Sequence, residues 1–312
     1  LLATNRTEIA SKFCEVASAQ MMDLSNLRGY SSVLGIKAEI EYQRQNFKIA
    51  DLSLRKAAML DIKLGDGRSR ILRLKRRIEM VLMREDKAFE AESKDLFAVS
   101  DRLLNDIGRY LGSNSAIGEK KLQAEVLSLE AQLRLAQGSF TEALRAIDRA
   151  REIYQESGNL LEHAVCLIVS SLILERVAAQ QSSAVLEESF ELYSKAIEEL
   201  DKLESLGLQW RARYFRARVA IKLSEVAYSE ADKEEYLYKA DDDLFESAEL
   251  AQSGDSLELS GVFLFAPLFS VTPGDVVELA ANLHGEHLKD KDLRRRWFDR
   301  WPRSKGRKFY RV

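Results

Sequence analysis

Residues 138–150 read GSFTEALRAIDRA, and residues 46–57 read NFKIADLSLRKA. Both contain the pattern Phe-x-x-Ala-x-x-x-Leu/Ile-x-x-Ala, which places two alanines and one large apolar residue on one face of a helix. Small residues let two helices cross closely, and the larger residue between them fills the groove. The two stretches therefore predict helices that pack tightly against a preceding helix.

Five glycines follow helical stretches of this kind at intervals of 46 to 49 residues: Gly65, Gly112, Gly158, Gly207 and Gly254. A glycine just past a helix end adopts the left-handed conformation that stops the helix. A regular period of this size is typical of stacked helix pairs. We expect an array over 1–256 with hairpins near 26–65, 69–112, 119–158, 160–207 and 209–254, preceded by a half-repeat helix at 4–24.

The pattern resembles the second helix of a tetratricopeptide repeat, and Ala38 and Ala131 stand where that family has a small residue on the first helix. Glu41 and Arg134 replace the family's aromatic residue on that helix, and the spacing is longer than the family's period of about 34 residues. The resemblance implies an all-α, right-handed α-solenoid of antiparallel helix pairs. It also implies that the first helices line a concave groove.

The two ends of the chain differ from the repeats. The helix at 4–24 has no partner before it, which favours a chain cut from a longer protein, although an isolated capping helix would look the same. At the other end, Thr272 is expected to cap a helix that starts at Pro273, has Asp275 in its first turn and is closed by Gly285. We expect residues 257–312 to form C-terminal capping helices followed by a basic, aromatic tail.

The composition favours a non-catalytic protein. All three prolines lie beyond residue 266, which suits nearly continuous helix before that point. Cys14 and Cys166 are too few for a disulfide framework and are expected to be buried thiols of a cytoplasmic protein. His284 and His287 have the spacing of metal ligands but no partner that completes a site, so no metal and no cofactor is expected. No catalytic motif is present, so no enzymatic role is expected in this segment, while a neighbouring catalytic domain stays open.

Two basic helices are candidate binding surfaces. Residues 68–84 carry seven Arg or Lys and one Glu, and a second basic patch follows at 211–222. Arginine forks bind carboxylates with two hydrogen bonds, so these helices would suit an acidic peptide. The alternative is solvated charge or ion pairing with neighbouring acidic helices, such as the run 241–243. The partner-binding candidates are Arg70, Arg73, Arg77, Arg84, Arg213 and Arg216.

The segment 289–312 has eleven Lys or Arg against three Asp, a net charge of +8 that leaves −11 for the rest of the chain. Aromatic residues among arginines suit stacking on nucleic-acid bases and contact with phosphates. They also suit docking on the acidic body, or no fixed structure at all. The candidate residues of this tail are Arg294, Arg295, Arg296, Trp297, Trp301, Arg307 and Lys308.

These observations lead to one functional expectation. The chain is expected to be an interaction scaffold or sensor module that binds a protein or peptide, without contact to a membrane. Its long repeats resemble the helical sensor regions of large multidomain signalling regulators. The alternative is a nucleic-acid-binding protein that uses the tail and the helix at 68–84.

Overall fold

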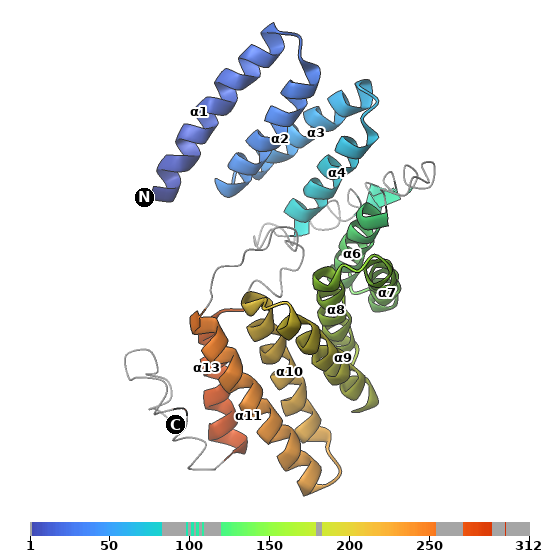
Figure 1. Cartoon of the computed structure of the whole chain (residues 1–312), viewed down its shortest axis with the longest axis vertical. Coiled ribbons are helices and arrows are strands. Elements are labelled where there is room, and N and C mark those ends of the chain that lie inside the picture. Colours follow the sequence, from blue (N-terminus) through green and yellow to red (C-terminus); the bar gives the residue numbers. More distant parts are fainter. Residues whose placement is uncertain are drawn as a thin grey trace. The chain divides into compact units, whose positions relative to one another are not determined.

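The computed structural model describes residues 2–82, 98, 101–102, 104–105, 108, 120–178, 183–253, 271–288 and 297. Within these ranges the fold is all-α, as expected, and consecutive helices pack as antiparallel pairs (Figure 1). Gly112, Gly254, Arg84 and every tail candidate except Trp297 lie outside the described residues. The chain divides into two compact units, Leu1–Gln137 and Gly138–Val312.

Unit 1 contains five helices among its described residues: α1 (Leu2–Asp23), α2 (Leu27–Gln43), α3 (Phe47–Lys63), α4 (Gly67–Leu82) and α6 (Lys120–Ala136). Each of α1 to α4 packs against the next, and α4 also contacts α6. The repeat pattern accounts for this packing, because Ala38, Ala50 and Ala57 are fully buried and Leu54 is almost so. Ser31 donates a hydrogen bond from α2 to the carbonyl of Ala57 on α3 at 3.3 Å, which shows how closely these helices approach.

Unit 2 contains the other described helices: α7 (Phe140–Glu156), α8 (Leu160–Ala178), α9 (Ser183–Lys202), α10 (Leu206–Val226), α11 (Glu230–Ser253), α13 (Pro273–Asn282) and a π-helical turn, η2 (Leu283–His287). Serines again stand at close crossings: Ser189 donates to the carbonyl of Ser171, and Ser247 to that of Trp210. A buried cluster of this unit joins α10, α11 and α13 around Trp210 and Trp297. The terminal helix therefore covers apolar surface of the last long hairpin.

The start of α13 confirms the expected helix cap. Asp275 accepts hydrogen bonds from the backbone amide and the hydroxyl of Thr272, both at 2.7 Å, and Pro273 is the first helical residue. The expected stop at Gly285 is wrong. Gly285 lies inside η2, so the chain continues as a wider turn to His287.

Six turns between the described helices share one conformation. The second residue of each has a φ between 53° and 76°: Ser25, Gln45, Gly65, Gly138, Gly158 and Glu204. At Ser25, Gln45, Gly65, Gly158 and Glu204 the amide of the following residue donates back to a carbonyl in the last helical turn, as from Asn46 to Glu41 at 2.8 Å. This is the Schellman ending of a helix. Gly65 and Gly158 were expected to end helices and do so.

One of the expected helix ends is wrong. Gly207 ends no helix, because it is the second residue of α10 and Glu204 takes the left-handed position instead. Helix pairs also recur at a shorter interval than the glycines in two places, where successive helices start at Leu27, Phe47 and Gly67 and at Lys120, Phe140 and Leu160. The described helices from α8 to α11 are longer, and a helix pair there is about as long as the glycine interval.

The shared turn makes a stability prediction. Replacing Gln45 by Gly should raise the free energy of unfolding by about 0.5–1 kcal/mol, because a left-handed residue with a Cβ is strained. Gly158→Ala should lower it by about 1 kcal/mol for the same reason. Urea unfolding followed by circular dichroism measures both. Gln43→Gly, in the last helical position of α2, is the control and should destabilise; equal effects of the two Gly variants would contradict the argument.

Candidate functional site

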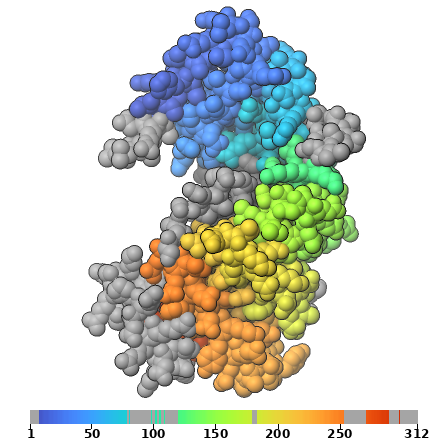
Figure 2. Space-filling model, viewed as in Figure 1, coloured from blue at the N-terminus to red at the C-terminus, as the bar shows by residue number. Residues whose placement is uncertain are grey.

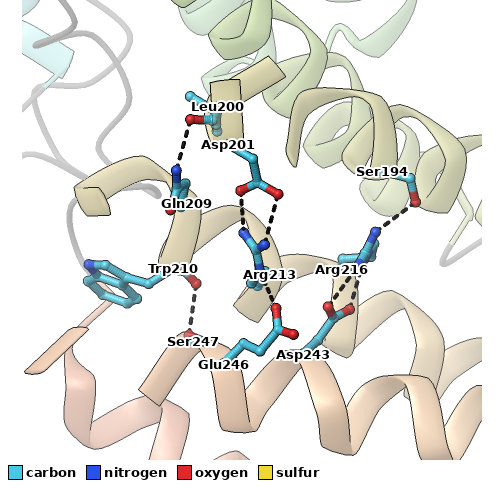
Figure 3. Close-up of polar contacts among 10 residues, drawn as sticks. All are labelled: Ser194, Leu200, Asp201, Gln209, Trp210, Arg213, Arg216, Asp243, Glu246 and Ser247. Atoms are coloured by element: carbon cyan, nitrogen blue, oxygen red, sulfur yellow. Dashed lines mark hydrogen bonds and ion pairs between the residues drawn. The ribbon is translucent and has the colours of Figure 1, made fainter. Parts of the chain in front are cut away.

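The basic residues of α10 form the densest polar network in the described part of unit 2 (Figure 3). Arg213 holds Asp201 on α9 through two hydrogen bonds of 3.1 and 3.0 Å, and holds Glu246 on α11 at 2.7 Å. Burial tends to lower the pKa of Arg213, but the hydrogen bonds and charges of the two carboxylates outweigh it and raise that pKa above its ordinary value. Arg213 therefore links three consecutive helices.

Arg216 lies one turn further along α10 and makes the same kind of link. Its guanidinium donates to both carboxylate oxygens of Asp243 on α11, at 2.8 and 2.6 Å, and to the hydroxyl of Ser194 on α9 at 3.0 Å (Figure 3). Asp243 is 4% exposed, and burial raises the pKa of its carboxyl above the ordinary value while Arg216 opposes the rise. For Arg216, the alternative of ion pairing with the acidic run 241–243 is confirmed.

The local sequence of α10 positions this network. Gln209 donates to the carbonyl of Leu200 at the end of α9, and the carbonyl of Trp210 accepts from Ser247 on α11 (Figure 3). These contacts fix α10 between its neighbours at the turn before Arg213. Arg218 and Lys222 then meet the buried Glu175 of α8 at 2.6 and 2.8 Å. Arg213, Arg216, Arg218 and Lys222 of the second basic patch are thus engaged with carboxylates of their own unit.

The first basic helix, α4, shows the same arrangement in unit 1. Arg77 forms an ion pair with Asp51 on α3 at 2.6 Å, and Arg73 lies 3.8 Å from Asp61, which is also on α3. Gly35 on α2 makes room for Arg73, because a Cβ there would come within 2.3 Å of the guanidinium. Arg70 is half-buried on α4. Binding of a partner by these arginines stays a prediction, and an incoming carboxylate would have to compete with Asp51 and Asp61.

The described residue of the tail is docked on the body. Trp297 is 1% exposed, donates from Nε1 to Asp241 Oδ1 at 2.8 Å, and packs edge-on against Phe245. His284 Nε2 reaches the same Asp241 oxygen at 2.8 Å. For Trp297, this is the arrangement that intramolecular docking predicts.

The cysteines and histidines lie within the packing. Cys14 and Cys166 are buried free thiols, as expected. His163 is 9% exposed and its Nδ1 lies 2.8 Å from Glu199 of α9, so it joins two helices. In the ranges that the structure describes, no three His, Cys, Asp or Glu side chains lie together as a metal site would need.

The sequence reasoning missed one surface, the outer face of α3. Ile49, Leu52, Met59 and Ile62 are between 46% and 62% exposed there. The signal was present in the sequence, because these residues fall on one helical face opposite the buried Ala50, Leu54 and Ala57. Most exposed large apolar side chains among the described residues belong to unit 1. Figure 2 shows its helices α1 to α3 in blue at the molecular surface.

Comparisons with known proteins add little to this description. No protein-family model matches the chain, and no curated protein matches it. Among solved structures, it is similar to a protein described as a circular tandem repeat protein with novel repeat topology and enhanced subunit contact surfaces. That similarity has 16% identity and a TM-score of 0.37, and it covers 96% of this chain and 76% of the other.

Two statements about the chain rest on its own helices. None of the helices in the described ranges is both long and apolar enough to cross a lipid bilayer. The helices of each unit pack as sequential antiparallel pairs, and the same turn recurs at six connections between described helices. The chain is an all-α helical repeat protein.

Proposed function

We propose that this chain is a non-catalytic interaction module that binds a protein or peptide on the surface of unit 1. The observation that carries the proposal is the set of large apolar side chains exposed there. On α1, Ile9, Phe13 and Val16 are 52%, 71% and 57% exposed, and α3 adds the four residues of its outer face. Soluble proteins seldom expose apolar residues in groups unless the group meets a partner.

Two further observations support binding over chemistry. The described cysteines are buried, and His163 and His284 are engaged with carboxylates inside the packing. The tetratricopeptide-like pattern, with Ala50, Ala57, Ala143 and Ala150 fully buried at helix crossings, is also typical of scaffolds that present a surface. A regulatory protein with further domains would use such a module to recruit a partner.

The experiment is capture of macromolecules by the immobilised full chain from an extract of cells that express it, with and without nuclease. The expected result is a protein that survives nuclease and forms cross-links, located by mass spectrometry, to residues 8–72. Capture of nucleic acid instead, lost at moderate salt and on deletion of residues 294–312, would overturn the proposal and support the nucleic-acid alternative. Reversing the charge of Arg73 or Arg77 is a poor test, because each forms an ion pair within unit 1.

A further inference from the structure

The exposed face of α3 combines apolar and basic side chains. At 100° per residue, its exposed residues occupy an arc of about 140°. The arc holds four large apolar and four basic side chains, all classed as exposed: Lys48, Ile49, Leu52, Arg55, Lys56, Met59, Ile62 and Lys63. The carboxylate beside it, Asp51, is held by Arg55 and Arg77, both at 2.6 Å.

Helix α7 shows that the fold does not require this face. The two helices share the repeat pattern residue for residue, with Ala50 and Ala57 matching Ala143 and Ala150. At the positions of the four exposed apolar residues of α3, α7 carries only polar ones: Glu142, Arg145, Glu152 and Gln155. The apolar residues of α3 therefore serve something other than the packing of a repeat.

The charges on the same face differ from those of the other basic helices. Among the described residues, Lys48, Lys56 and Lys63 form no ion pair, in contrast to the arginines of α4 and α10. At 100° per residue these three unpaired ammonium groups lie between the exposed apolar residues, so the face is both apolar and positively charged. Its complement is a helix face that combines large apolar residues with carboxylates.

We infer that the outer face of α3 is a docking surface for an acidic amphipathic helix of a partner protein, whose apolar stripe covers Ile49, Leu52, Met59 and Ile62 while its carboxylates meet Lys48, Lys56 and Lys63. This inference rests on the proposed function and names its surface and the chemistry of its partner. Docking of one helix on another suits the site, because such contacts are made by residues spaced at i, i+3 and i+7 on one helical face. The exposed apolar residues of α3 lie on one such face.

The test is fluorescence anisotropy with two synthetic capped helical peptides of 17 residues, the length of α3. One has a leucine stripe flanked by Glu, and the other has Lys at the same flanking positions. The full chain should bind the Glu peptide, more weakly as salt increases, and should bind the Lys peptide at least tenfold more weakly. Equal binding of the two peptides would overturn the inference.

Variants taken from α7 locate the binding. Met59→Glu and Leu52→Arg install the residues that α7 has at the same positions, so the fold tolerates them, and each should weaken the Glu peptide at least about tenfold. Lys56→Glu should weaken it several-fold, whereas Arg149→Glu, the matched change on α7, should leave affinity unchanged. Melting temperatures close to that of the parent chain would show that the variants fold. Unchanged affinity in Met59→Glu would overturn the assignment to α3.

Other occupants give different results. Binding to anionic phospholipid vesicles that Met59→Glu abolishes, without binding of the Glu peptide, would assign the face to a lipid surface. Concentration-dependent dimerisation lost in the same variant would assign it to a second copy of the chain. If the immobilised chain still captures a protein but the Glu peptide fails, the α3 inference falls and the proposed function stands. Loss of protein capture itself overturns the proposed function.

Discussion

Arg216→Met is expected to lower the free energy of unfolding by about 3–5 kcal/mol near neutral pH, because it leaves the buried carboxylate of Asp243 without its counter-charge. Arg216 supplies both hydrogen bonds that the structure shows on that carboxylate, at 2.6 and 2.8 Å. Asp243 is 4% exposed, so water cannot replace the lost donors. Urea unfolding followed by circular dichroism measures the loss.

The loss of unfolding free energy in Arg216→Met should increase with pH. Burial raises the pKa of Asp243 above its ordinary value of 3.8, and Arg216 lowers it. A raised carboxyl pKa contributes stability that is fully present below the unfolded pKa and is lost as pH rises through the folded pKa. Removing Arg216 raises the folded pKa further, so the protonated, uncharged Asp243 persists to higher pH in the variant. The deficit of Arg216→Met should therefore be small near pH 4 and grow toward neutral pH.

A double variant is the matched control. Arg216→Met with Asp243→Leu removes both charges and should be clearly more stable at neutral pH than Arg216→Met alone. Its stability difference from the parent chain should lose most of the pH dependence. A deficit of Arg216→Met that is the same at pH 4 and pH 7, or a double variant no better than the single one, would contradict this account of the pair.

Trp297→Ala is expected to cost about 3–5 kcal/mol of unfolding free energy, because it removes a large side chain from a closed core and leaves a cavity. The indole is 1% exposed, and its cluster includes Trp210, Leu244 and Val277. The substitution also takes a hydrogen-bond donor from the buried Asp241. Thermal and urea unfolding of the full chain measure the effect.

Trp297→Phe separates packing from hydrogen bonding. It keeps most of the apolar contact and loses the donor to Asp241, so it should cost about 1–3 kcal/mol. A Trp297 that served nucleic-acid stacking would behave differently. Trp297→Ala would then leave the unfolding free energy unchanged and reduce only nucleic-acid affinity, which would contradict the docked arrangement.

The sequence predicted the helix-crossing positions well but not every helix end, for one physical reason each. The four alanines at this spacing predicted close helix crossings, because small residues allow two helices to approach. All four are fully buried: Ala50, Ala57, Ala143 and Ala150. One helix end was misplaced because glycine is sufficient but not necessary for the left-handed turn. Ser25, Gln45 and Glu204 occupy the same conformation without being glycines, and the glycine expected to end α9, Gly207, lies inside α10 instead.

The candidate arginines show a different limit. Their clustering on two helices is visible in the sequence, but their carboxylate partners lie on other helices, Asp201 and Glu246 for Arg213 and Asp243 for Arg216. Which carboxylate faces which arginine depends on how neighbouring helices are rotated, and composition does not specify that.

The outer face of α3, by contrast, could have been found from the sequence. Met59 and Leu52 contrast with Glu152 and Arg145 once the two repeats are aligned on their alanines. An apolar residue at a position where the sister repeat is charged has no packing role to explain it. Comparison between repeats of one chain therefore carries information that the helical periodicity of a single repeat does not.

The recurring turn has a consequence for how such a gene can change in length. Residues 27–66 form one helix pair that begins just after one such turn and ends with another. Duplication of this segment would place Leu27, the start of α2, after Asp66, and its deletion would place Gly67, the start of α4, after Asn26. In both cases the new connection is a turn of the recurring type. Unequal recombination can thus add or remove whole helix pairs while keeping the same type of connection. A breakpoint inside a helix would instead move the small residues away from the positions where helices cross.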